Sequence, residues 1–218
     1  MDVFGDQWKD HPAKIAANWR RLVREEDVVL LPGDFSWAMR LPEAEPDLRF
    51  LAELPGRKIL IRGNHDYWWA SIAKVRAALP AGVFAIQNDH LVVDGFAICG
   101  SRGWNLPNGC LPGDDSPKHF ARERNRLEIS LASAPPDLPK IAMLHFPPTL
   151  TCTDDPGFTD ILEAHGVQLC VYGHLHGKQD HRLGIQGERN GVQYLLCAAD
   201  AVNFAPVPLP VESIASTR

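Results

Sequence analysis

Four short polar clusters carry the residues of this sequence that are suited to binding metal ions. Each cluster follows a run of apolar residues, and glycine precedes the first ligand candidate in three of them, as Gly33, Gly63 and Gly173. The clusters hold carboxylate, amide and imidazole side chains but no thiol, namely Asp34, Asn64, His65, Asp66, His145, His174 and His176. Such oxygen and nitrogen donors suit Mn²⁺, Fe or Zn²⁺ in a catalytic site. The clusters therefore predict a catalytic metal centre.

The apolar runs before the clusters predict the strands that position these residues. They are short, continuous and rich in Val, Ile and Leu, which is typical of strands buried on both faces, and they span 28–31, 59–61, 141–144 and 169–172. In open α/β sheets the binding crevice lies outside the carboxyl ends of the strands, so the four clusters are expected to meet there. Further strands are expected at 83–86, 91–93, 96–99 and 192–197.

Helical patterns separate many of these runs. An apolar stripe with helical spacing is formed by Ile15, Trp19, Leu22 and Val23. Three more helices are expected, at 67–79, 118–132 and 158–164. The sequence shows no internal repeat and no flexible linker, so residues 1–218 are expected to form one domain of the mixed α/β class.

The sequence resembles the calcineurin-like metallophosphoesterase superfamily in the order of its clusters, Gly33-Asp34, Gly63-Asn64-His65-Asp66, a lone His145 and Gly173-His174-Leu175-His176. This resemblance covers about residues 28–177. It implies a sandwich of two mixed β-sheets flanked by helices. It also implies a phosphoesterase that hydrolyses a phosphomonoester or phosphodiester by attack of a hydroxide bridging two divalent metal ions, which are Mn, Fe or Zn.

The resemblance further implies which residues bind the two metals. Asp34 bridges them. Asn64, His145 and His174 complete one metal site, and His176 binds the other metal.

Two catalytic residues are implied in the same way. His65 protonates the leaving oxygen or stabilises the transition state, and Asp66 holds the His65 ring. Arg102, in a loop after a predicted strand, is a candidate for binding the substrate phosphate because its guanidinium can donate two parallel hydrogen bonds. A solvated loop arginine fits the sequence at Arg102 equally well.

One motif of the superfamily is missing. Its first motif, Asp-x-His at the end of an N-terminal strand, supplies two further ligands to the metal bound by His176, and no Asp-x-His occurs in this sequence. The expected fold therefore lacks the first strand and is N-terminally incomplete, unless Asp6, Asp10 or His11 supplies the ligands. The alternative function is a degenerate or truncated member that binds metal or a phosphorylated ligand without efficient turnover.

The composition argues against several other classes of protein. The 218 residues carry a net charge of -5, with Lys and Arg spread along the chain, so no strong nucleic-acid signature is present. No apolar stretch approaches the roughly 20 residues of a membrane span, and residues 1–10 do not resemble a secretory signal, so a cytoplasmic location without a membrane partner is expected. The expected partner is a small phosphoester or phosphoprotein substrate, selected by the loops 35–47, 101–116 and 147–157.

The cysteines indicate neither a zinc ribbon nor a dithiol redox motif. They are odd in number and lack Cys-x-x-Cys spacing, at Cys99, Cys110, Cys152, Cys170 and Cys197. Reduced, buried thiols are therefore expected.

Overall fold

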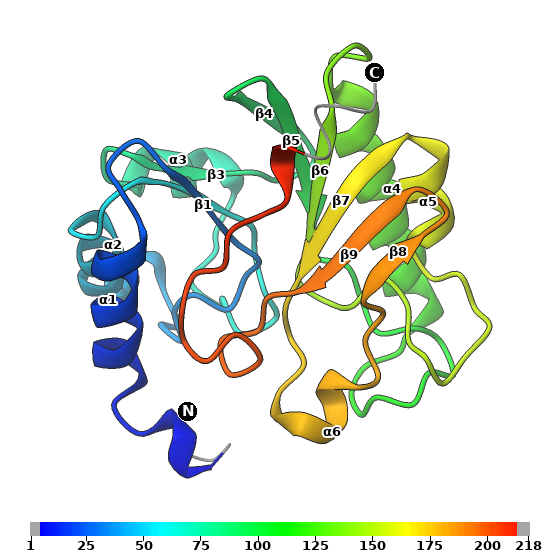
Figure 1. The fold of residues 1–218 in the computed structure, drawn as a ribbon, viewed down its shortest axis with the longest axis horizontal. Helices are drawn as coiled ribbons and strands as arrows, with labels where there is room; N and C mark the ends of the chain where they lie inside the picture. The colour runs from blue at the N-terminus through cyan, green and yellow to red at the C-terminus, as the bar shows by residue number, and fades with distance from the viewer. Residues whose placement is uncertain (1–4, 213–218) are drawn as a thin grey trace.

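The computed structural model describes residues 5–212 as two β-sheets packed face to face, with helices on their outer sides (Figure 1). The smaller sheet has the strand order β1-β2-β3 and consists of β1 (Val28–Leu31), β2 (Arg57–Leu60) and β3 (Val83–Ala85). These three strands are all parallel, whereas a mixed sheet was expected. The predicted architecture of two sheets flanked by helices is confirmed.

The larger sheet has the strand order β4-β5-β6-β7-β9-β8. Its strands are β4 (His90–Val93), β5 (Phe96–Ser101), β6 (Lys140–Leu144), β7 (Val167–Tyr172), β8 (Gly187–Arg189) and β9 (Val192–Leu196). The four inner strands run parallel, and β4 and β8 pair antiparallel at the two edges. The carboxyl ends of the inner strands therefore lie along one side of this sheet.

Helices cover the outer face of each sheet. Against the smaller sheet pack α1 (His11–Leu22), α2 (Glu45–Ala52) and α3 (Ile72–Ala78). Against the larger sheet pack α4 (Pro117–Ser133) and α5 (Thr159–Ala164), while α6 (Gly177–His181) follows β7. Short 3₁₀ helices, η2 (Asp6–Trp8) and η3 (Leu41–Ala44), precede α1 and α2. None of the helices in residues 5–212 combines the length and the apolar character needed to cross a membrane.

Alternating side chains along the inner strands build the interior of the sandwich. In β6, Ile141 and Met143 pack between the two sheets, whereas Ala142 and Leu144 pack on the side of α4 and α5. Successive residues of a strand point to opposite faces, so one continuous apolar run supplies both layers. The sequence prediction of doubly buried strands holds for β6 and β7.

Two local predictions differ from the structure. The expected helix over 67–79 begins only at Ile72, because Tyr67 and Trp69 form turns by donating backbone N–H groups to His65 and Asp66 at 2.8 and 3.2 Å. Strand β8 was not predicted, although Asn190-Gly191, which has positive φ at both residues, is a typical two-residue hairpin turn.

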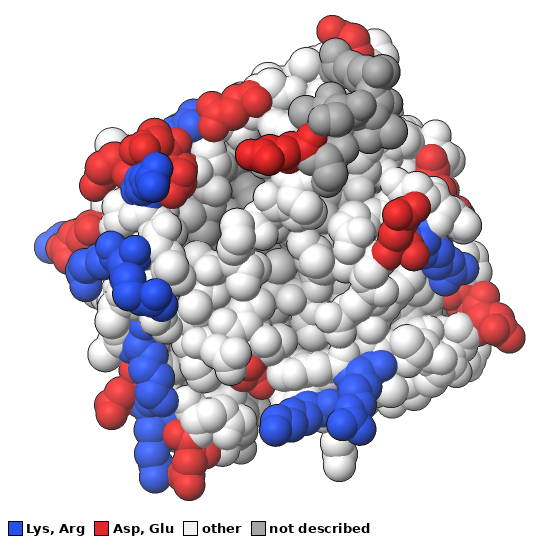
Figure 2. Space-filling model, in the orientation of Figure 1, with Lys and Arg blue, Asp and Glu red and all other residues white. Residues whose placement is uncertain are grey.

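Strand β1 is less buried than its apolar sequence predicts. All four of its residues are partly exposed, and within residues 5–212 it pairs with β2 alone. An apolar groove with a volume of about 640 Å³ lies beside it, lined by residues of β1, α1 and the segment 205–209 among others. Figure 2 shows this side of the molecule, where charged side chains lie mainly around the rim of a largely uncharged area.

Candidate metal centre

The four polar clusters meet where strands of both sheets end. Asp34 and Asn64 follow β1 and β2 of the smaller sheet, whereas His145 and His174 follow β6 and β7 of the larger one. The backbone at Asp34 and His174 is left-handed, with φ of 57° and 69°. Residues other than glycine adopt this conformation rarely, and such strained positions cluster at functional sites.

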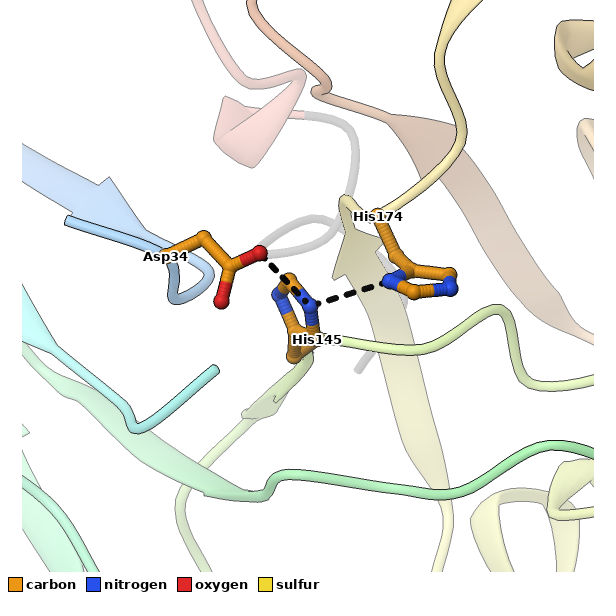
Figure 3. A group of neighbouring side chains, drawn as sticks. All are labelled: Asp34, His145 and His174. Carbon is orange, nitrogen blue, oxygen red and sulfur yellow. Dashed lines mark hydrogen bonds and ion pairs between the residues drawn. The ribbon is translucent and has the colours of Figure 1, made fainter. Parts of the chain in front are cut away.

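The side chains of Asp34, His145 and His174 point toward one another (Figure 3), and one ligand atom from each lies within 4.8 Å of the others. The Nε2 atom of His145 lies 3.4 Å from Asp34 Oδ2 and 3.2 Å from His174 Nδ1. The Asn64 Oδ1 atom lies 2.6 Å from His145 Nε2 and 3.1 Å from His174 Nδ1. Two oxygen donors and two nitrogen donors thus converge on one small space, which fits a divalent cation.

The two imidazoles are held in the form that binds metals. His145 Nδ1–H donates a hydrogen bond to the carbonyl oxygen of Pro32 at 2.9 Å. The lone pair of Nε2 therefore faces the other candidate metal-ligand atoms. Burial lowers the pKa of His145 to about 3 and the pKa of His174 to about 2. Both rings are therefore neutral at pH 7, as metal ligation requires. Burial also raises the pKa of Asp34, although hydrogen bonds and nearby imidazoles oppose this effect.

Asp66 connects the two loops that carry the candidate oxygen ligands, Asp34 and Asn64. Its side chain is 0% exposed. Its two oxygens accept hydrogen bonds of 2.7 to 3.1 Å from the backbone N–H groups of Asp34, Phe35, Ser36 and Gly63 and from the indole N–H of Trp68. A carboxylate with this many donors fixes the loops after β1 and β2 relative to each other.

The His65 ring has other partners than the one expected. Its Nδ1 atom lies 3.1 Å from the hydroxyl oxygen of Tyr67, and the ring stacks on Trp37 with centroids 4.7 Å apart. Because the loop N–H groups occupy the oxygens of Asp66, the structure does not support the expected contact between Asp66 and this ring. The backbone N–H of His65 donates to Asp34 Oδ1 at 2.8 Å, which places His65 next to the metal centre.

Asp200 is a site residue that the sequence analysis missed. Its side chain is 4% exposed and lies 3.2 Å from His176 Nδ1 and 3.3 Å from His181 Nε2, and it accepts the N–H of Gly177 at 2.7 Å. Burial raises the pKa of Asp200, but the hydrogen bonds from His176 and Gly177 outweigh it and lower the pKa to about 2. Asp200 follows the carboxyl end of β9, which is the kind of position from which the other site residues were predicted. The same criterion could therefore have identified Asp200 from the sequence.

The substitute ligands considered near the N-terminus do not join the centre. Asp6 pairs with Lys9 at 2.9 Å, and His11 Nδ1 bonds the carbonyl oxygen of Trp8 at 2.9 Å. Within residues 5–212, the only group of His, Cys, Asp or Glu side chains whose ligand atoms gather closely enough to hold a metal is the one containing Asp34. Neither Asp6, Asp10 nor His11 belongs to it.

Residues 3–178 match the family model of the calcineurin-like phosphoesterases. The chain belongs to this family. A protein of unknown function, AQ665 from Aquifex aeolicus, has a similar fold, with a TM-score of 0.50 at 18% identity over 91% of this chain and 81% of that chain. The phosphopantetheinyl hydrolase PptH from Mycobacterium tuberculosis gives a TM-score of 0.49 at 16% identity over 89% and 83% of the two chains. No curated protein matches this sequence.

In this calcineurin-like phosphoesterase, Arg102 is not the solvated loop residue that the sequence allowed. Its side chain is 14% exposed, lies 3.5 Å from Glu123 and stacks over the Trp104 ring at 4.3 Å. Burial lowers the pKa of Arg102 to about 10, with Glu123 opposing the shift. Its carbonyl oxygen accepts the N–H groups of His145 and Phe146, both at 3.0 Å, so the Arg102 loop adjoins the metal centre.

Two loops of this phosphoesterase are joined by a disulfide between Cys110 and Cys152, which are 42 residues apart in the sequence. The expectation of reduced, buried thiols is wrong for these two residues and holds for Cys99 and Cys170, while the free thiol of Cys197 is partly buried. The pairing depends on the loops 101–116 and 147–157 lying side by side, which spacing alone does not reveal. Disulfides are rare in the cytosol, and the cytoplasmic location stays a prediction.

Proposed function

We propose that the chain is a metal-dependent phosphoesterase that hydrolyses a phosphomonoester or a phosphodiester, with residues 1–218 forming a single domain. The observation that carries this proposal is the convergence of Asp34, His145 and His174 within 4.8 Å, in a member of the calcineurin-like phosphoesterase family. A small phosphoester or a phosphoprotein is the proposed substrate.

The donor set supports a site for two divalent ions, Mn, Fe or Zn. Asp34, Asn64, His145 and His174 would hold one ion, and His176 would hold the other with Asp34 shared between them. When bound, two such ions supply positive charge to the phosphoryl oxygens and lower the pKa of an attacking water. The protein contributes a rigid, buried frame, because Asp66 fixes the loop that carries Asp34.

His65 is the proposed group that protonates the leaving oxygen. Its backbone N–H bond to Asp34 places it beside the metal centre, and Trp37 and Tyr67 limit the motion of its ring. An imidazole suits this role because a ring N–H can donate its proton to the leaving oxygen.

One observation favours the second candidate function, a protein that binds metal or a phosphorylated ligand with poor turnover. His176 contacts Asp200, yet residues 5–212 contain no second group of three His, Cys, Asp or Glu side chains close enough to hold a metal. The sequence also lacks the Asp-x-His motif, and the edge of β1 beside the apolar groove has no second strand partner in the part of the chain that is described.

Metal stoichiometry and turnover distinguish the two functions. The chain is loaded with Mn²⁺, its metal content is measured by elemental analysis, and hydrolysis of p-nitrophenyl phosphate and bis(p-nitrophenyl) phosphate is followed. The proposed phosphoesterase binds about two ions per chain and loses its turnover on chelation. One ion or fewer, without turnover, supports the binding protein instead, and turnover that survives chelation overturns the metal dependence.

Substitution of the ligands provides the matched test. Asp34→Asn and His174→Ala are expected to lower turnover by more than about 100-fold. The loss of a residue that only orients a metal ligand already lowers metal affinity or activity by about 10- to 100-fold. The control is Glu188→Gln, which changes an exposed carboxylate in β8, outside the loops expected to select the substrate. Equal activity of Asp34→Asn and the control contradicts the assignment of Asp34.

A further inference from the structure

A small polar cavity lies beside segments that adjoin the candidate metal centre. It has a volume of about 60 Å³, and its walls include Arg62, Arg102 and Arg126. Arg62 immediately precedes the cluster that contains Asn64, and the carbonyl oxygen of Arg102 accepts the N–H of His145. The cavity is therefore lined by the loop that carries Asn64 and by the loop after β5, which is hydrogen-bonded to the backbone of His145.

The charges around this cavity do not balance. Glu123 of α4 is 1% exposed, and its Oε1 atom lies 2.7 Å from Arg126, 3.5 Å from Arg102 and 3.8 Å from Arg122. The positive charge of Arg62 also acts on Arg102 and helps to lower the pKa of that guanidinium. Three arginines and one carboxylate line the cavity, namely Arg62, Arg102, Arg126 and Glu123, so its wall has a surplus of positive charge.

Two hydrogen-bond donors of residues that line the cavity lack an acceptor within residues 5–212. The Nε atoms of Arg62 and Arg102 are buried and have no hydrogen-bond partner among the described residues. A buried donor without an acceptor is unfavourable by about 1–3 kcal/mol, and native proteins rarely leave one unsatisfied. The planar guanidinium donates in a fork that matches the oxygens of a phosphate. A volume of about 60 Å³ is several times the space that one water needs, so a small oxyanion fits where a ring does not.

We propose that this cavity binds a second phosphoryl group of the substrate, so that the preferred substrates carry two phosphoryl groups, as diphosphates or bisphosphates do. Arg62, Arg102 and Arg126 hold the group that is not cleaved. The choice of substrate rests on the proposed phosphoesterase function, whereas binding of an oxyanion by the cavity does not.

Binding is tested without turnover. The full chain is treated with a chelator, so that phosphate has no metal ion to bind, and is titrated with inorganic phosphate by calorimetry. Arg126→Gln is expected to weaken binding by about 10-fold or more, because it removes one charged donor from the cavity. The matched control is Arg122→Gln on the same helix, whose side chain is 46% exposed and which does not line the cavity. This control is expected to stay within about twofold of the unchanged chain.

Glu123→Gln tests the opposite direction. Removing the carboxylate frees the arginines, so phosphate is expected to bind about threefold or more tightly. A variant that only destabilised the fold would not bind phosphate more tightly. Absence of phosphate binding by the unchanged chain, or equal affinities for Arg126→Gln and Arg122→Gln, overturns the site.

The Mn²⁺-loaded chain then tests the substrate class. Arg126→Gln is expected to raise the KM for pyrophosphate about 10-fold while leaving kcat and the KM for p-nitrophenyl phosphate unchanged, since that ester has a single phosphoryl group. An equal effect on both substrates overturns the substrate assignment. If the unchanged chain hydrolyses neither of these compounds nor bis(p-nitrophenyl) phosphate, the proposed phosphoesterase function fails, and the calorimetric result still decides whether the cavity binds an oxyanion.

Discussion

The carboxylate of Asp66 accepts a hydrogen bond from the backbone N–H of Asp34 at 2.8 Å, although the two residues lie in loops that follow different strands of the smaller sheet. The same carboxylate accepts the N–H of Gly63 at 2.7 Å. A buried anion therefore joins the loops after β1 and β2, and the position of the proposed metal ligand Asp34 depends on a residue that is not itself a proposed ligand.

Replacement of Asp66 is expected to weaken the fold. Asp66→Ala leaves five N–H groups without their acceptor, so the free energy of unfolding is expected to fall by about 3 kcal/mol or more. Urea denaturation measures the change, with the exposed Asp154→Ala as the control. A loss below about 1 kcal/mol contradicts the anchoring role.

Replacement of Asp200 is expected to weaken metal binding at His176. The carboxylate beside Nδ1 orients this ring, and loss of such a partner typically lowers metal affinity by about 10- to 100-fold. Titration of Asp200→Asn with Mn²⁺, followed by calorimetry, measures the effect without an activity assay. Asp154→Asn serves as the control, and identical affinities for the two variants argue against the role of Asp200.

Gly63→Ala is expected to displace Asp34. A Cβ atom at Gly63 overlaps the side chain and the backbone nitrogen of Asp34, so the loop after β1 must move. Metal affinity is expected to fall by about 10-fold or more. In the control Gly82→Ala, no atom lies within 4 Å of the added Cβ and φ is 77°. That variant is expected to lose about 1–2 kcal/mol of stability while keeping its metal affinity, and equal metal loss in both variants speaks against a local effect.

Loss of the disulfide is expected to lower stability. Cys110→Ser opens a link between residues 42 positions apart, and in the chain-entropy description such a link contributes about 2–4 kcal/mol to the free energy of unfolding. Urea denaturation of the oxidised protein measures the loss, and Cys197→Ser, which removes a free thiol, is the control. Alkylation of the denatured, unreduced chain should label three cysteines, and labelling of all five shows that the link is absent.

The candidate metal ligands were largely accessible from the sequence because they depend on local patterns. A buried parallel strand is a short apolar run, and its polar end marks the carboxyl edge of a sheet, so Asp34, Asn64, His145 and His174 were found from the residues beside them. The structure then brings these four side chains together as expected.

The remaining features depend on which distant segments become neighbours, and only the tertiary structure decided them. Asp200 meets His176 because β9 pairs with β7, Cys110 meets Cys152 because two loops lie side by side, and Arg102 meets Glu123 across the outer face of the larger sheet. Each contact joins residues at least 21 positions apart, from Arg102 to Glu123, and no local periodicity encodes such a pairing. The sequence by itself determined the ligand types and their order along the chain, whereas strand pairing and the packing of loops and helices on the larger sheet determined these contacts.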